Sequence, residues 1–130
     1  MEKDFDSWNI LKKKLDENKI APFFKARDVW WCSIGLNVGD EENGKNQFFS
    51  RPVLVIRKFN NHLFLGLPLT TQIKENKYYH QITFKNAQQC VMMSQLRIFE
   101  SRRMRSRMGN LSKGQFGEIK KRLVEIIVED

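Results

Sequence analysis

The sequence predicts an α+β, mainly β fold in which about five to six short strands form a small barrel or strongly curved sheet between two helices. The chain has 130 residues, enough for one domain with a real core and too few for two ordinary domains. Apolar residues recur at helical spacing near the two ends. Between them, segments of strand type follow one another with short connections, which disfavours a parallel βαβ arrangement.

Residues 4–19 are predicted to form an N-terminal helix that is ended by Pro22. Its apolar residues lie three or four positions apart and therefore share one face: Phe5, Trp8, Leu11 and Leu15. We interpret residues 1–22 as an N-terminal helical extension and residues 23–130 as the barrel domain with its C-terminal helix.

The central segments are predicted to be strands because they are rich in β-branched and aromatic residues. Asn60–Asn61 is a tight-turn signal, so the strands on either side of it should form a hairpin. Pro52 lacks an N–H and therefore suits the first position of its strand. The five segments are residues 29–36, 52–59, 62–68, 78–84 and 90–99.

A second helix is predicted toward the end of the chain. Ser112 and Gln115 are three residues apart and match a capping box at a helix start. Behind them, one apolar stripe recurs at helical spacing and should close one side of the sheet. The stripe consists of Phe116, Ile119, Leu123, Ile126 and Ile127.

The charge favours a polyanionic partner. The chain carries 23 basic and 15 acidic residues, a net charge of +8, which suits nucleic acid or a membrane surface. No apolar stretch is long enough to span a bilayer, and no signal-peptide pattern opens the chain. We therefore expect a cytoplasmic protein with no membrane partner.

The cysteines and histidines do not form a metal-site pattern. Cys32 and Cys90 lie inside apolar runs and are expected to be small buried hydrophobes. His62 and His80 are isolated and lack the spacing of metal ligands, so we expect neither a metal nor another cofactor.

The candidate site lies where two predicted strands meet polar residues. Arg51 precedes the strand that Pro52 opens, and Thr70 follows the strand that Pro68 ends. Arginine offers a planar fork of donors that matches a phosphate, and a threonine hydroxyl positions one oxygen. The loop before the arginine adds three carboxylates, which are Asp40, Glu41 and Glu42. Together these groups would suit RNA cleavage by the 2′-OH of the RNA, but spacing alone leaves open a solvated arginine beside a polar loop.

Six motifs follow one another along the chain: RDVWW at 27–31, GDEENG at 39–44, RPVLVI at 51–56, PLTTQ at 68–72, SQLR at 94–97 and GNLS at 109–112. RPVLVI, PLTTQ and SQLR in this order are a specific combination. In these motifs, from Arg27 to Val128, the chain resembles the PemK/MazF family, the ribonuclease toxins of bacterial toxin–antitoxin pairs.

This resemblance implies a small SH3-like barrel with helices, which agrees with the predicted strands, and a homodimer. It implies an endoribonuclease toxin, or mRNA interferase, that cuts single-stranded mRNA at short specific sequences and leaves a 2′,3′-cyclic phosphate and a 5′-OH. A cognate antitoxin would keep it silent. On the matching positions, the functional arginine is Arg51, and Thr70 would orient the scissile phosphate. Because the chain lacks a metal-ligand pattern, we expect the cleavage to be metal-independent.

The general base is less directly indicated. Ser94 stands where some family members carry an aspartate thought to act as the base. Arginine cannot readily serve, since its pKa above about 12 keeps it protonated. The resemblance aligns an acidic loop residue with Glu41, which we assign to take the 2′-OH proton, with Glu42 and His80 in reserve.

Sequence specificity is expected from unpaired bases that stack on side chains and are read along their edges. Candidate contacts lie in the loops, although loop aromatics often pack into their own domain: Phe48, Phe49, Thr71, Gln72, Lys74, Lys77 and Tyr78. The basic run SRRMRSR at 101–107 is interpreted as attraction for RNA or for an acidic antitoxin tail, or as a solvated helix face.

Two other functions stay open at this point. A non-catalytic RNA- or peptide-binding SH3-like module is favoured by Ser94 in place of a carboxylate. A DNA-directed regulator would follow from the positive charge, but no helix-turn-helix or zinc pattern supports it.

Overall fold

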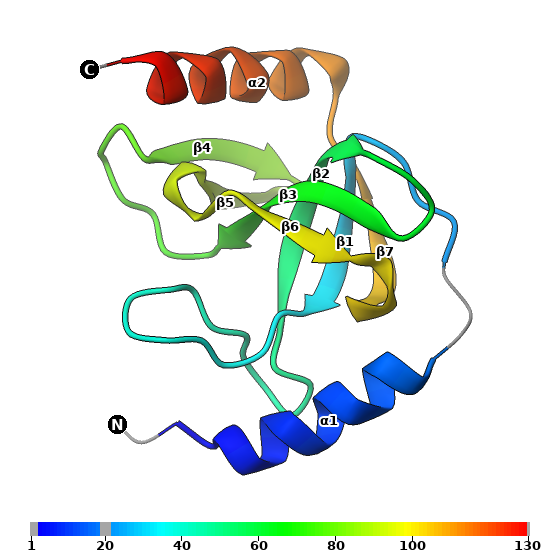
Figure 1. The fold of residues 1–130 in the computed structure, drawn as a ribbon. Coiled ribbons are helices and arrows are strands. Elements are labelled where there is room, and N and C mark those ends of the chain that lie inside the picture. Colours follow the sequence, from blue (N-terminus) through cyan, green and yellow to red (C-terminus); the bar gives the residue numbers. More distant parts are fainter. Residues whose placement is uncertain (1–2, 19–21, 130) are drawn as a thin grey trace.

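The computed structural model describes residues 3–18 and 22–129, so residues 1, 2 and 19–21 of the predicted extension lie outside the described residues. In the described part, helices α1 (Phe5–Glu17) and α2 (Lys113–Val128) lie on opposite sides of an antiparallel sheet of seven strands (Figure 1). The strands are β1 (Asp28–Ser33), β2 (Ser50–Lys58), β3 (Leu63–Thr70), β4 (Tyr79–Phe84), β5 (Ala87–Met92), β6 (Arg97–Glu100) and β7 (Met104–Asn110).

The sheet is barrel-like but open. Its strand order is β4-β5-β3-β2-β1-β7, and β6 pairs with the first half of β3 while β5 pairs with its last two residues. The two edge strands, β4 and β7, do not pair with each other among the described strands. The mainly β fold with a helix at each end is confirmed, and the predicted turn at Asn60–Asn61 joins β2 to β3 as a hairpin.

Two segments differ from the sequence prediction. The predicted strand at 90–99 is divided by a short 3-10 helix, η1 (Met93–Gln95), into β5 and β6, which lets the chain pair with both halves of β3. The basic run at 101–107 does not form the face of an α-helix. It forms a second 3-10 helix, η2 (Ser101–Arg103), and then the edge strand β7, which pairs with β1.

Strand β2 is buried on both faces, which explains why its apolar residues run without alternation. Leu54 and Ile56 belong to the core cluster that α2 covers, whereas Val53 and Val55 belong to a second cluster on the other face. The second cluster includes Phe64 and is closed by β6, β7 and the segment that precedes β1.

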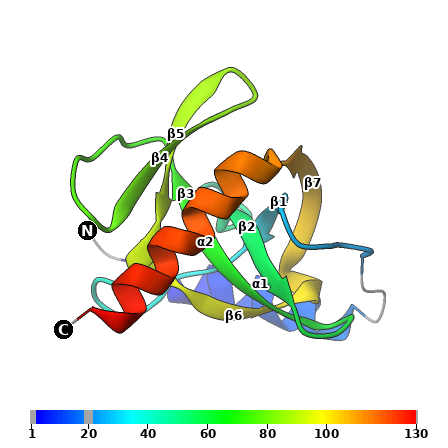
Figure 2. The ribbon, with the colours of Figure 1, turned by 90° about the horizontal axis from the view of Figure 1, so that it is seen from above.

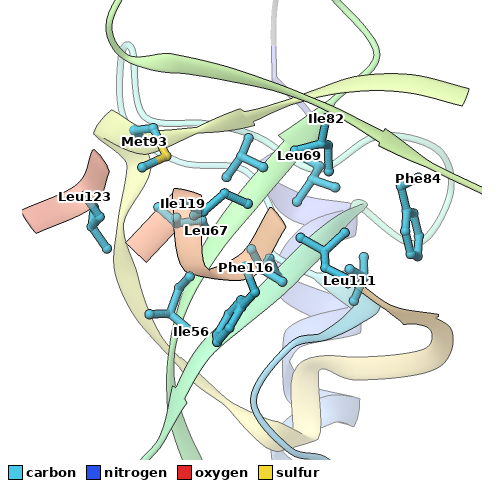
Figure 3. Packing of buried hydrophobic residues seen from close by; sticks show 13 residues of the cluster. Ile56, Leu67, Leu69, Ile82, Phe84, Met93, Leu111, Phe116, Ile119 and Leu123 are labelled. Carbon is cyan, nitrogen blue, oxygen red and sulfur yellow. The ribbon is translucent and has the colours of Figure 1, made fainter. Parts of the chain in front are cut away.

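Helix α2 begins where the capping box predicts, since Ser112 Oγ accepts from Gln115 N at 3.2 Å. Three residues of its predicted apolar stripe are buried against the sheet: Phe116, Ile119 and Leu123. Figure 3 shows these side chains among residues of β2, β3, β4 and η1, and Figure 2 shows α2 lying across the sheet.

Helix α1 is attached to the sheet mainly through one side chain. Trp8 is buried, and its ring packs over Gly35, which has φ of +83°. Cys32 and Cys90 are buried free thiols, and burial raises the pKa of the Cys32 thiol. In the described part of the chain, neither helix has the length and apolar character needed to cross a membrane.

The packing of Trp8 on Gly35 leads to a prediction about stability. A Cβ at Gly35 would lie 2.1 Å from the Trp8 ring and would require a side chain at positive φ. We expect Gly35→Ala to lower the free energy of unfolding by about 1–3 kcal/mol, measured by urea unfolding followed by tryptophan fluorescence.

Gly117→Ala is the matched control, because Gly117 lies in α2 with open space around its Cβ position. This change should stabilise the protein by about 0.5–1 kcal/mol. A Gly35→Ala protein as stable as the wild type would show that Trp8 does not need this glycine.

Candidate functional site around Arg51 and Thr70

Arg51 and Thr70 lie beside each other because of the register of two strands. Val53 of β2 pairs with Pro68 of β3, and Arg51 and Thr70 are each two residues further toward the same end of the hairpin. Since side chains alternate across a strand, both point to the same face. Arg51 Nη1 donates to the Leu69 carbonyl at 3.4 Å, which fixes the guanidinium at this strand end.

Both side chains line one small cavity of about 130 Å³. Each residue is largely buried, with 9% of Arg51 and 6% of Thr70 exposed, so a group bound here would be shielded from water. The remaining lining residues come from β1, β2, β3, β5 and the loop before β2: Trp31, Lys45, Asn46, Ser50, Pro52, Leu69, Thr71 and Gln89.

The Arg51 guanidinium is held from several sides. Its Nε donates to the Asn43 carbonyl at 2.6 Å, and its Nη2 forms an ion pair with Glu42 Oε1. Together with the Leu69 carbonyl, these partners fix the planar fork in one orientation. A fork preorganised in this way can stabilise negative charge that develops on a phosphate.

Thr70 supplies a neutral donor next to this charge. Its Oγ1 accepts from Gln72 N at 3.2 Å, so the backbone orients the hydroxyl. The hydroxyl hydrogen has no acceptor among residues 3–18 and 22–129 and is available to a ligand oxygen in the cavity.

Glu42 is the acidic loop residue that reaches Arg51. Asn37 Nδ2 donates to the Glu42 carbonyl at 2.7 Å, and Glu42 N donates to Gln95 Oε1 at 3.2 Å. These bonds tie the loop to η1 and orient the carboxylate toward the arginine. The sequence named Glu42 only as a reserve for the base.

Glu41 has a different environment. Its Oε1 accepts from Val38 N at 3.1 Å, and the residue lines a second cavity of about 390 Å³ that also contains Ser94 and Arg97. Burial lowers the pKa of Arg97, and the nearby Glu41 carboxylate acts in the opposite direction. Glu42 lines this second cavity too, so the Glu42–Arg51 ion pair lies where the two cavities approach each other.

The acidic loop rests on helix α1. Lys3 Nζ donates to the carbonyls of Asn37 and Gly39 at 2.6 and 3.3 Å. The Trp8 ring lies 5.7 Å from the Phe49 ring, at the point where the loop joins β2. The helix therefore supports the segment that carries Glu42.

The predicted RNA contacts lie in two groups. Phe48 is covered by the Arg105 guanidinium, 3.5 Å from its ring centroid, and Phe49 packs on Trp8. The others lie along the exposed loop between β3 and β4: Thr71, Gln72, Lys74, Lys77 and Tyr78. Of these, Thr71 lines the Arg51 cavity.

Two of the lysines in that loop already have partners. Lys74 Nζ lies 5.1 Å from the Tyr79 ring centroid, and Lys77 Nζ forms a 3.0 Å ion pair with Glu129. Hydrogen bonds to Glu129 and Tyr78 raise the pKa of Lys77. His80, the other reserve base, lies in β4 and is not among the residues that line the Arg51 cavity.

Sequence reasoning did not single out five polar or aromatic residues of the cavity: Trp31, Lys45, Asn46, Ser50 and Gln89. Only Trp31 carried a signal, since it belongs to the RDVWW motif next to the β1–β2 pairing. In the described part of the chain, no three His, Cys, Asp or Glu side chains come together as a metal site.

Solved structures share this fold. MazF from Deinococcus radiodurans superposes with a TM-score of 0.69 at 19% identity, covering 85% of this chain and 100% of that one. An endoribonuclease in complex with its cognate antitoxin from Mycobacterial species has a TM-score of 0.62 at 11% identity, covering 81% and 95% of the two chains. For Mycobacterium tuberculosis toxin MazF-mt6 the TM-score is 0.60 at 14% identity, with 80% and 99% covered.

No curated protein sequence matches the chain significantly. A family model does match, over residues 25–127, and it describes the PemK-like, MazF-like toxin of type II toxin–antitoxin systems. The matched residues include Arg51, Thr70 and the acidic loop but not helix α1. On this match, which spans most of its length, the chain belongs to the PemK-like, MazF-like toxin family.

Proposed function

We propose that the protein is a metal-independent endoribonuclease toxin that cleaves single-stranded mRNA at specific sequences by attack of a ribose 2′-OH. The observation that carries this proposal is the buried pair of Arg51 and Thr70 in one small cavity, in a chain of a toxin family. The family's relatives include a solved endoribonuclease bound to its antitoxin, which supports the same activity here.

In the proposed reaction, the 2′ oxygen forms a bond to phosphorus and the bond to the 5′ oxygen breaks. The products are a 2′,3′-cyclic phosphate and a 5′-OH. Arg51 binds the non-bridging phosphate oxygens and stabilises the charge that grows on them, while the Thr70 hydroxyl donates to one oxygen and orients the phosphate.

The proton of the 2′-OH needs an acceptor near Arg51. Glu41 was the first choice from the sequence, but the geometry favours Glu42, because Glu42 is already paired with Arg51 whereas Glu41 accepts from Val38 N. An incoming phosphate competes with Glu42 for the guanidinium and releases a carboxylate oxygen to take the proton. In one concerted shift, Arg51 passes a proton to the leaving 5′ oxygen while the protonated Glu42 passes one to Arg51, so the guanidinium stays charged.

The loops around the cavity would supply specificity. Thr71 and Gln72 continue directly from Thr70, and Lys74 and Lys77 follow in the same exposed loop, so they can contact bases on one side of the cut. Phe48, in the loop before β2 that also carries the lining residues Lys45 and Asn46, offers a ring for stacking where Arg105 does not cover it. Phe49 is engaged by Trp8 and would contribute through the shape of the loop.

We further propose a cytoplasmic homodimer whose activity is blocked by a cognate antitoxin. The family is defined by toxin–antitoxin pairing, and solved relatives include a MazE–MazF complex from Deinococcus radiodurans. The basic surface of β7 suits an acidic partner as well as RNA. In domain terms, residues 23–130 would be the toxin unit and residues 1–22 an extension.

One observation favours an alternative, a non-catalytic RNA- or peptide-binding module. Ser94 supplies no carboxylate at the place where some family members have one. In the free protein, Glu42 forms an ion pair with Arg51. Under this alternative RNA would bind, but no new 5′-OH ends would appear.

Removal of either cavity donor should silence cleavage. Arg51→Ala and Thr70→Val are each expected to lower the cleavage rate by about 10²–10³-fold, because each removes a donor to the phosphate. The rates are measured on a long unstructured RNA with mapping of the 5′-OH ends, which also gives the cleaved sequence.

Arg57→Ala is the control, since Arg57 lies on the same strand but is exposed. Its rate should equal that of the wild type. If the wild-type protein yields no discrete fragments from several long RNAs, the endonuclease proposal is wrong.

The two acidic candidates can be separated by substitution. Glu42→Gln should lower the single-turnover cleavage rate by about 10²–10⁴-fold, whereas Glu41→Gln should have a much smaller effect. A Glu42→Gln protein that cleaves as fast as the wild type or faster would show that this carboxylate only covers Arg51 and does not accept the proton.

A further inference from the structure

A third cavity, large enough to hold a ligand, lies between helix α1 and η2. Its volume is about 350 Å³, and it shares no lining residue with the Arg51 cavity. We call it the α1–η2 cleft. It is lined by Asn9, Lys12, Lys13, Leu15, Asp16, Glu100, Arg102 and Arg103.

The cleft carries an excess of positive charge. Four of its residues are cationic and two are acidic. Both carboxylates are engaged by Arg102, whose Nε lies 2.6 Å from Glu100 Oε2 and whose Nη1 lies 3.9 Å from Asp16 Oδ1. Glu100 and Asp16 are therefore both paired with Arg102. The other cationic side chains of the cleft remain for an external anion.

Lys12 and Lys13 have no ion-pair partner among residues 3–18 and 22–129. Both are exposed on α1, so an anion can reach them. Arg103 lies deeper, with Nη1 donating to the Ser33 carbonyl at 3.2 Å. Burial lowers the pKa of Arg103, and repulsion from Arg97 acts in the same direction, whereas the nearby Glu100 carboxylate acts in the opposite direction. An anion bound beside Arg103 would act in the same direction as Glu100.

A chain of ring and cation contacts connects this cleft to the Arg51 cavity. Arg103 lies over the Trp8 ring at 5.7 Å, and Trp8 packs on Phe49, two residues before Arg51. On β7, Arg105 stacks on Phe48.

The loop that carries Phe48 and Phe49 also lines the Arg51 cavity. Lys45, which lines that cavity, is bridged to Ser50 by two backbone hydrogen bonds of 2.8 and 2.9 Å. Cationic side chains therefore recur from α1 to the cavity, along rings that pack within the domain, an arrangement that suits a strand with a phosphate at every step.

We propose that the α1–η2 cleft binds phosphates of the RNA strand that flank the cleaved bond, so that helix α1 extends the substrate footprint of the toxin. This inference rests on the proposed function, since it takes RNA as the substrate. Helix α1 lies outside the residues matched by the family model, so the subsite belongs to this chain's extension. RNA is favoured over an acidic peptide because the cations lead from the cleft to the Arg51 cavity, where the proposed function places the cleaved phosphate.

The test compares Lys12→Gln/Lys13→Gln with a matched control, Lys120→Gln/Lys121→Gln. Both double variants lose two exposed lysines, but the control pair lies on α2, on the other side of the sheet (Figure 1). Binding is measured by fluorescence anisotropy with mixed-sequence 2′-O-methyl RNA of about 5 and about 15 nucleotides. This RNA cannot be cut by 2′-OH attack, so binding is measured whether or not the wild type cleaves.

For the long RNA, we expect the α1 variant to bind more weakly and the slope of log K against log[salt] to shrink by about 1.4, or about 0.7 for each lost phosphate contact. For the short RNA, the α1 variant and the wild type should bind alike. The control pair should change neither. Unfolding by urea should be the same for all three proteins, because the substituted side chains are exposed.

Three results would overturn the inference. The α1 variant could bind the long RNA with the wild-type affinity and salt slope, or the control pair could weaken binding as much as the α1 pair. The variant could instead lose affinity for a poly-glutamate peptide and not for RNA, in which case the cleft serves an acidic protein partner. If the wild type binds as expected but never cleaves RNA, the proposed function fails while the cleft remains an RNA subsite.

Discussion

The charge of Arg51 is the constraint on which the surrounding structure depends. The residue precedes a strand segment that is buried on both faces, and only 9% of it is exposed. A buried charge is tolerated when it is paired and hydrogen-bonded. The carbonyls of Leu69 and Asn43 and the carboxylate of Glu42 meet this need, so the loop must return across the strand end. Helix α1 in turn supports that loop through Trp8.

Much of this arrangement follows from local sequence. The run VLVI after Pro52 is apolar without alternation, as expected for a strand buried on both faces, and Asn60–Asn61 sets the hairpin that brings Thr70 beside Arg51. The apolar spacing of α2 and the capping of its first turn by Ser112 likewise depend on residues only a few positions apart. Features decided by neighbours in sequence were therefore predictable.

The remaining features depend on distant partners. Whether Glu41 or Glu42 faces the arginine is decided by bonds from Asn37 and Gln95, the latter 53 residues away in sequence. The break at η1 similarly exists because β3 offers different pairing partners along its length. Neither the choice of acidic residue nor the break at η1 follows from residue spacing or strand propensity, since tertiary contacts override both.

The way α1 is seated bears on the order in which the chain assembles. Its residues are synthesised before the sheet, yet Arg102, which donates to the Asp16 carbonyl, follows 86 residues later. Lys3 similarly waits for Asn37, 34 residues further on. Trp8 can contact Gly35 and Phe49 as soon as the acidic loop is made, but the bond from Arg102 to α1 and the bond from Glu42 N to Gln95 Oε1 form only after η1 and η2 have been synthesised.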